Sequence, residues 1–383
     1  MHNVKEDLLE ELISLRKQLH LNPELSGQEI QTARRVVAYL KDCNRSEIIE
    51  RVGGFGVVAI FDSEKPGPSI MFRADLDALP IQEVNTFAHS SKTEGVSHKC
   101  GHDGHTCVVL GLARMLSANP PKRGKVVLLF QPAEEDGMGA KAVLSDPRFQ
   151  AIRPDYIFAF HNLPGYPLHQ VVLRRGSFTS AVKSIIIKLK GKTAHAAEPE
   201  FGINPALPIS EILQYAALLS NNKPERADFT LITPVHIAMG EIAYGISAGH
   251  GEVRLTIRSW TQQQMEELAQ KLVVGIQQIA EKYGIEVAYS WTHEFSANKN
   301  NDQAIDMLET AAGELALDIL HRSTPFKWGE DFGLFTQHYN GAMFGIGSGE
   351  KCPALHNPDY DFPDEIMATG ILLFHQISLT LLK

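Results

Sequence analysis

Residues 125–136 read KVVLLFQPAEED, an apolar run that ends in a loop carrying two adjacent carboxylates. The run has the length of a strand, and its apolar residues do not alternate with polar ones, which is typical of a strand covered on both faces of a parallel sheet. In open α/β sheets, binding sites form beyond the carboxyl ends of strands. Glu134 and Glu135 therefore lie where a site is expected, although adjacent carboxylates more often belong to a solvated charge run.

Similar short apolar runs recur along the chain, at residues 56–61, 69–73, 156–160 and 342–346. Helical patterns separate them, for example at residues 106–116. This order predicts an α/β domain with a mainly parallel sheet.

The N-terminal region predicts two helices. In the first, leucines recur at helical spacing with charges between them, at Leu8, Leu9, Leu12, Leu15 and Leu19. This pattern is typical of an amphipathic surface helix and not of a signal peptide, which needs an unbroken apolar core. Ser26 and Glu29 form a capping-box pattern, which predicts a second helix at residues 29–40.

The middle of the chain has a different pattern. Strands are predicted at 182–189, 230–239, 252–258 and 285–291, and helices at 205–219 and 262–283. The order β-α-β-β-α-β is that of a ferredoxin-like sandwich. We therefore predict an inserted α+β domain at residues 181–295, within a catalytic domain formed by residues 1–180 and 296–383.

The composition narrows the classes of function. A chain of 383 residues, 44% of them hydrophobic, can build two domains. Its net charge is −9 and its Lys and Arg residues are scattered, which argues against nucleic-acid binding. No stretch of about 18 apolar residues predicts a membrane span. Four cysteines in so long a chain form no disulfide framework, so we expect a cytoplasmic protein.

Residues 98–105 read HKCGHDGH, and this segment predicts a metal site. Residues two apart in an extended segment point to the same side, so Cys100 and His102 can face one ion. A thiolate and an imidazole suit Zn²⁺ or a similar first-row metal. The alternative is a polar loop with a buried cysteine, before a helix that Asp103 caps.

Other strands end in residues able to bind metal. The run at 156–160 leads to His161, and the run at 69–73 leads to Asp75 and Asp77. Several strand ends of this kind favour a metal site over isolated structural residues. One glutamate of the pair at 134–135 could bind metal, while the other could transfer a proton. His356 lies far along the chain in the loop ALHNPDYDF, and by itself it is most simply a surface histidine.

These segments together resemble amidohydrolases of the hippurate hydrolase, N-acyl-amino-acid and auxin-conjugate type, within the aminoacylase and carboxypeptidase metallopeptidase family. The matching strings occur in the family's order across nearly the whole chain: RKQLHLNPELSGQE, FRADLDALP, KCGHDGHT, LLFQPAEE, FAFHNLPG, GKTAHAAEP, GEDF and LHNPDYDF. The resemblance implies a di-metal peptidase-like α/β domain with an inserted ferredoxin-like domain that serves as a lid and forms a homodimer.

The resemblance also implies residue roles. It makes Glu134 the general base. It makes Asp77 a carboxylate that does not bind metal itself but fixes the orientation of the metal ligands. It makes His195 a residue that polarises the scissile carbonyl, in related enzymes at the partner's active site; by itself, this histidine is a surface residue at a strand end. Asp75 is left out of the ligand set. The implied metal ligands are Cys100, His102, Glu135, His161 and His356.

One segment departs from the family pattern. Gly245 and Ala248 replace the Asn and Pro of an Asn-x-Ile-Pro stretch associated with substrate binding. This puts the substrate preference in doubt more than the chemistry. Arg258 is retained, and its planar fork could bind a substrate carboxylate, although a structural strand arginine explains it equally well.

The sequence therefore predicts metal-dependent hydrolysis of N-acyl amino acids, with two divalent ions drawn from Zn²⁺, Mn²⁺, Co²⁺ and Ni²⁺. A dipeptidase or carboxypeptidase on the same scaffold is the nearest alternative. A metal-bound binding protein without turnover is a second, although such a protein has no need of Glu134. A di-metal phosphoesterase would show a phosphate-binding nest or basic cluster, which the sequence lacks.

Overall fold

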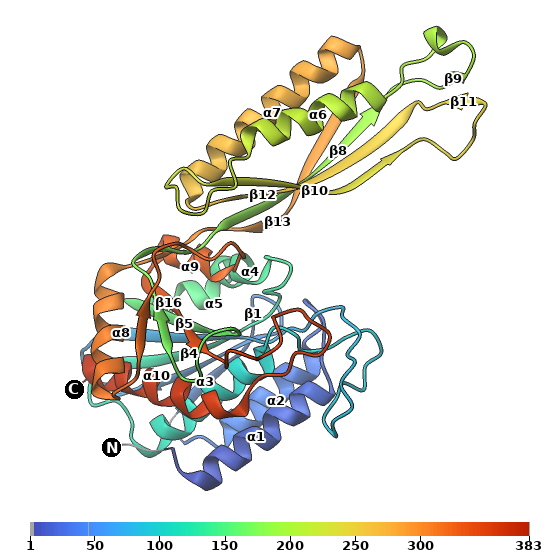
Figure 1. The fold of residues 1–383 in the computed structure, drawn as a ribbon. Coiled ribbons are helices and arrows are strands. Elements are labelled where there is room, and N and C mark those ends of the chain that lie inside the picture. Colours follow the sequence, from blue (N-terminus) through green and yellow to red (C-terminus); the bar gives the residue numbers. More distant parts are fainter. Residues whose placement is uncertain (1–3, 45, 383) are drawn as a thin grey trace. The chain divides into compact units, whose positions relative to one another are not determined.

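The structure is a computed structural model that describes residues 4–44 and 46–382. The predicted catalytic domain therefore includes a few residues, 1–3, 45 and 383, that lie outside the described chain. The chain forms two compact units (Figure 1). The first contains the chain up to Phe178, Asn298–Ser323 and the chain from Glu330 onward, and the second contains Thr179–Ala297 and Thr324–Gly329.

The second unit includes a segment that the sequence assigned elsewhere. The predicted inserted domain, residues 181–295, is two residues shorter at each end than the main part of this unit. Residues 324–329 were predicted in the catalytic domain but cluster with the second unit. The N–H group of Ser180 donates to the carbonyl of Phe326, which ties this short segment to the start of the unit.

The first unit is built on an eight-stranded sheet with the order β1-β2-β4-β3-β5-β16-β6-β15. Its four central strands, β4, β3, β5 and β16, run parallel, as the sequence predicted. Every residue of β3 is buried, which explains why its apolar residues do not alternate with exposed ones. The strands are β1 Ser46–Val52, β2 Gly56–Asp62, β3 Ser69–Asp75, β4 Lys125–Gln131, β5 Tyr156–Leu163, β6 Val171–Leu173, β15 Ile319–His321 and β16 Asn340–Gly347.

Helices cover both faces of this sheet. One group shares the main hydrophobic core with the strands: α1 Glu6–Leu21, α2 Ile30–Lys41, α3 His102–Ala118, α8 Asp302–Glu314 and α10 Met367–Leu381. The other face carries α4 Gly139–Ser145, α5 Pro147–Gln150 and α9 Phe332–His338 (Figure 1). The small elements are the paired strands β7 Gly176–Thr179 and β14 Asn298–Asn300, and the turn η2 Asp364–Ile366. No helix within the described residues has both the length and the apolar character that a membrane crossing needs.

The second unit has the predicted ferredoxin-like sandwich. Its antiparallel sheet has the order β10-β12-β8-β13, and α6 and α7 cover one face (Figure 1). Burial alternates along β12, as expected for a sheet with one covered face. Its elements are β8 Ala181–Lys190, β9 Ala194–His195, η1 Pro199–Phe201, α6 Ala206–Leu219, β10 Thr230–Met239, β11 Ile246–Ser247, β12 His250–Ser259, α7 Gln262–Tyr283 and β13 Glu286–Phe295.

The predicted capping box was wrong. Helix α2 begins at Ile30, and its N-cap residue Glu29 makes no side-chain capping bond. The Ser26 hydroxyl instead donates to Asp77 at 2.6 Å, and the Glu29 carboxylate accepts the N–H group of Ala133 at 2.8 Å. Both residues of the motif therefore support the loops that follow β3 and β4, a use that local sequence spacing could not reveal.

Candidate metal centre

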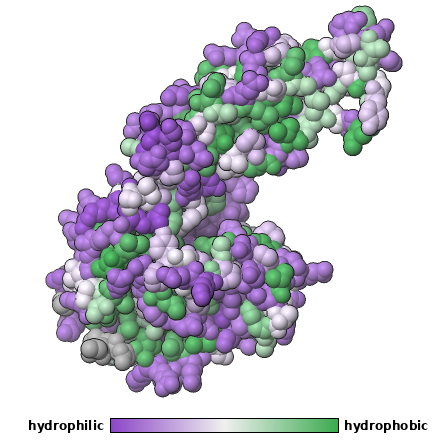
Figure 2. Space-filling model, viewed as in Figure 1, coloured by the Kyte–Doolittle hydropathy of each residue, from purple (hydrophilic) through white to green (hydrophobic). Residues whose placement is uncertain are grey.

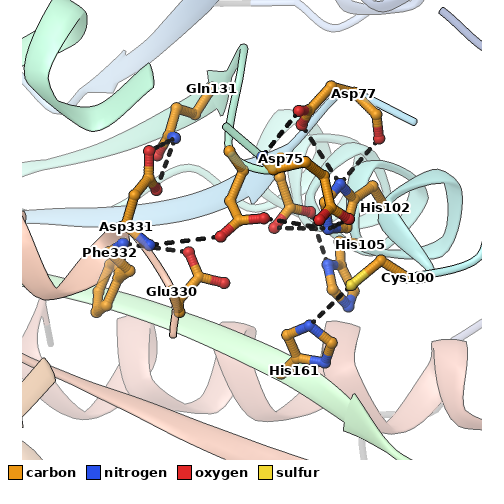
Figure 3. Close-up of polar contacts among 12 residues, drawn as sticks. Asp75, Asp77, Cys100, His102, His105, Gln131, His161, Glu330, Asp331 and Phe332 are labelled. Carbon is orange, nitrogen blue, oxygen red and sulfur yellow. Dashed lines mark hydrogen bonds and ion pairs between the residues drawn. The ribbon is translucent and has the colours of Figure 1, made fainter. Parts of the chain in front are cut away.

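The predicted site residues of the first unit gather at the carboxyl edge of its parallel strands. Asp77 follows β3, Glu134 and Glu135 follow β4, and His161 lies in the second half of β5. These strands are neighbours in the sheet, so their ends meet at one edge. Figure 3 shows His161, Cys100 and His102 pointing toward one another at this edge.

Cys100 and His102 meet in a way that differs from the predicted extended segment. Gly101 has a φ of +97°, in the left-handed region, and His102 is the first residue of α3. A Cβ on Gly101 would lie 2.7 Å from the Asn162 side chain, so glycine is required on both counts. The two ligand atoms still belong to one compact group, because this tight turn replaces strand alternation.

The two buried histidines among the predicted ligands, His102 and His161, each use one ring nitrogen for a hydrogen bond to the backbone. His102 places Nδ1 2.9 Å from the Asp77 carbonyl, and His161 places Nδ1 2.9 Å from the Asn162 carbonyl. Each Nδ1 therefore donates, which leaves the Nε2 lone pair for a metal. His161 Nε2 lies 3.4 Å from Cys100 Sγ.

Glu135, in the loop after β4, faces His102 at the start of α3. Its Oε1 lies 3.7 Å from His102 Nε2, and these two buried atoms make no hydrogen bond. Buried polar atoms without partners are costly, so two that face each other indicate space for a cation. The cation would satisfy both atoms at once.

His356 borders the centre on the solvent side. Its Nε2 lies 3.8 Å from Glu135 Oε2, and about half of its side chain is exposed. Its φ of +65° is unusual for a non-glycine residue, and its N–H group donates to the Lys99 carbonyl at 2.8 Å. This backbone bond joins the late loop to the segment that carries Cys100.

Asp77 supports the cluster instead of entering it. Besides Ser26, it accepts the N–H group of Glu135 at 3.0 Å, and its own carbonyl orients His102. Such contacts fix the orientation of a ligand. Asp77 thus contacts two predicted ligands, Glu135 and His102, and its supporting role stays a prediction.

The donor set fits divalent metal ions. Two groups of closely spaced ligand atoms share Cys100: Cys100, His102 and His161, and Cys100, Glu135 and His356. Burial raises the pKa of the Cys100 thiol and, with the crowding of other carboxylates, raises that of Glu135 to about 8. Buried acidic groups of this kind are stabilised in their charged forms by cations.

Glu134 lies between the ligands and a second acidic cluster. Its Oε2 is 3.9 Å from His102 Nε2, and its Oε1 accepts the N–H group of Asp331 at 3.4 Å. Burial, then the nearby Glu330 and Glu135 carboxylates, raise its pKa well above the usual value. The preceding Ala133 has a φ of +54°, a strained conformation of the kind found at functional sites.

Two further residues at the centre were not predicted to take part. His105 places Nδ1 2.7 Å from Asp75 and Nε2 2.5 Å from Asn162. Asp75, His102 and His105 form another group of closely spaced ligand atoms. The spacing of His102 and His105, three residues apart at the start of a helix, was the available signal.

Two predicted residues, His195 and Arg258, belong to the second unit. His195 is exposed, and its Nδ1 accepts the N–H group of Ala197 at 3.1 Å, so the ring can donate through Nε2. Arg258 is partly buried and donates to the Lys327 carbonyl at 2.7 Å. This bond ties β12 to the segment Thr324–Gly329 of the same unit.

Comparison with known proteins gives the family. The profile of peptidase family M20/M25/M40 matches residues 71–380. The chain belongs to the M20 peptidase family. It is 30% identical over 381 residues to the hippurate hydrolase of Campylobacter jejuni, with 98% of each protein covered. It is 32% identical over 346 residues to the N-acetyl-L-cysteine deacetylase of Bacillus subtilis, with 89% of this chain and 81% of that protein covered.

A solved M20 structure extends the comparison to the whole fold. A Bacillus subtilis protein, described as a dinuclear metal binding peptidase of the M20 family, matches with a TM-score of 0.83 and 26% identity, and 99% of each chain is covered. The predicted resemblance, the two-part α/β fold and the assignment to hydrolases of the amidohydrolase type are therefore confirmed.

Proposed function

We propose that the protein hydrolyses N-acyl amino acids, adding water across the amide bond to release a carboxylic acid and an amino acid. The observation that carries this proposal is the cluster of five predicted ligands beside one further buried carboxylate, Glu134. M20 relatives named hippurate hydrolase and N-acetyl-L-cysteine deacetylase support the substrate class.

We propose that two divalent ions bind here. Cys100, His102 and His161 would hold one, and Cys100, Glu135 and His356 the other. Bound ions of this kind polarise a carbonyl and lower the pKa of water toward neutrality. A thiolate ligand favours Zn²⁺, Co²⁺, Ni²⁺ or Mn²⁺ over Mg²⁺ or Ca²⁺.

The chain's own residues supply the proton transfers and the orientation. Glu134 accepts a proton from the attacking water and later delivers it to the leaving nitrogen. His195 donates through Nε2 to the oxygen on which negative charge develops, because its Nδ1 already accepts a backbone bond. Arg258 binds the carboxylate of the amino acid.

The first test is amine release by chelator-stripped protein supplied with each of the four metals in turn. The panel contains N-acetyl, N-benzoyl and indoleacetyl amino acids, and dipeptides to cover the alternative peptidase activity. We expect metal-dependent release from one acyl class. Absence of release with every metal, from protein that binds about two ions per chain, would contradict the proposed reaction and favour the binding-protein alternative.

We also propose that the second unit is a lid domain through which the protein forms a homodimer. Strand β10 is an edge of its sheet, and large apolar side chains are exposed along it and along α6: Leu207, Leu218, Val235, Ile237 and Met239. Figure 2 shows apolar side chains gathered over the helices of this unit. Pro234 and a register shift interrupt β10, so side-chain burial would contribute more than strand pairing.

Sedimentation equilibrium tests the dimer. The wild type is expected at twice the chain mass, and Leu218→Asp with Ile237→Asp at the mass of one chain. A single-chain mass for the wild type would rule out this assembly. For the compartment, we propose a reducing cytoplasm, since four cysteines in 383 residues are too few for a disulfide framework.

A further inference from the structure

A buried turn beside Glu134, formed by Glu330 and Asp331, contains none of the predicted ligands. We propose that Asp331 is a positioning residue that fixes the loop carrying Glu134 and orients its carboxylate; this rests on the proposed function of that site. Among the described residues, the N–H group of Asp331 makes the only hydrogen bond to the Glu134 side chain, at 3.4 Å. Contacts of catalytic groups are often this long before substrate binds.

The Asp331 carboxylate joins both ends of the loop that carries Glu134. It accepts two bonds from the Gln131 amide, at 2.9 and 2.8 Å, and one from the N–H group of Ala140 at 2.8 Å. Gln131 is the last residue of β4, and Ala140 lies in the first turn of α4. Glu134, the proposed base, therefore lies in the loop between Gln131 and Ala140, and the Asp331 carboxylate bonds to both of these residues.

The same carboxylate is itself held in place. Arg73 donates to Asp331 at 3.0 Å, to Glu330 at 2.9 Å and to Asp75 at 2.7 Å, and all four side chains are buried. Figure 3 shows Gln131 and Asp331 in contact on the side of the cluster away from Cys100. Three donor groups make four hydrogen bonds to its two oxygens, so the Asp331 side chain has one orientation, and so has the N–H group beside Glu134.

The need for an anchor follows from the path of the chain. Gly329 belongs to the second unit and Glu330 to the first, so the chain passes from one unit to the other immediately before this turn. A turn at such a crossing is subject to any displacement of the second unit. The bonds from Gln131 and Ala140 fasten it to the sheet and helix of the first unit instead.

The test is Asp331→Asn. The asparagine keeps the shape of the side chain, but its NH2 group is a donor and would face the donors of Gln131, Arg73 or Ala140. We expect kcat to fall by about 10- to 100-fold, with KM within about twofold of the wild-type value and the number of ions bound per chain unchanged. The exchange variant Gln131→Glu with Asp331→Asn restores a carboxylate–amide pair and should recover most of kcat. Asp318→Asn is the matched control, because the exposed Asp318 accepts the Gln170 amide at 2.6 Å far from this loop, and it should leave kcat unchanged.

A double-mutant cycle separates positioning from general support of the fold. If Asp331 acts through Glu134, then Asp331→Asn lowers kcat much less in a Glu134→Asp background than in the wild type. Should Asp331→Asn fail to fold, Gln131→Leu removes the amide bonds to Asp331, together with the bond that Arg73 Nε donates to the Gln131 amide oxygen at 2.9 Å. It should lower kcat about 3- to 10-fold with the same unchanged KM.

Three outcomes would overturn the inference: an unchanged kcat, loss of bound metal, or an equal loss of kcat in both backgrounds. These outcomes are read on whichever amide the wild type cleaves, so they are distinct from failure of the proposed function. If the proposed function fails, the wild type itself releases no amine from any member of the panel.

Discussion

Glu134→Gln is expected to lower kcat by about 10³-fold and to leave both bound ions in place. The amide has nearly the shape of the carboxylate but cannot accept the proton of the attacking water. Glu134 is not part of either ligand group that shares Cys100, and its Oε1 contacts the backbone of Asp331, which an amide oxygen can still do. This variant should therefore lose turnover and keep its bound metal.

The measurement compares kcat on the best substrate with metal content after dialysis. The neighbouring variant Glu135→Gln is the matched comparison, because Glu135 faces both His102 and His356 and should lose metal as well as activity. Substantial activity in Glu134→Gln, or loss of metal from it, would refute the assignment of Glu134 as the base.

The strands and the two-part organisation could be predicted because their signals are local. All seven residues of β3 are buried, and its apolar residues Ile70, Met71 and Phe72 follow one another without alternation, as expected for a strand covered on both faces. Helix α7 occupies the predicted range, Gln262–Tyr283, where apolar residues recur with helical period and Gly284 ends the helix in the left-handed conformation. Both patterns depend on neighbours in the sequence and need no tertiary information.

The polar contacts around the metal centre could not be predicted in the same way. Ser26 and Glu29 have the spacing of a capping box, yet they bond to the loops after β3 and β4, 51 and 104 residues away. Arg73 was visible as a charged residue inside an apolar run, but its partners Glu330 and Asp331 lie more than 250 residues later. The resemblance implies a ligand set, which stays a prediction, and tertiary contacts determine how those side chains are oriented.

Arg16→Leu is expected to lower the free energy of unfolding of the first unit by about 3–5 kcal/mol. Helix α1 was predicted as a surface helix, but it buries Arg16 to 1% exposure. The guanidinium forms ion pairs with Asp103 at 3.3 Å, Asp361 at 2.7 Å and Asp364 at 2.7 Å. Without it, these carboxylates remain partly or fully buried and lose the one cation that all three share, while His20 Nδ1 still lies 2.9 Å from Asp103.

Urea denaturation monitored by circular dichroism, with metal present, measures this loss, and Lys17→Leu is its control on the same helix. Lys17 is 40% exposed and lies 3.7 Å from Asp364, so its replacement should change stability by less than about 0.5 kcal/mol. Equal effects of the two substitutions would mean that the buried cluster contributes no more than a surface ion pair. A large effect of Arg16→Leu alone would instead identify Arg16 as the residue that joins α1 to the start of α3, directly beside His102, and to the loop that follows His356.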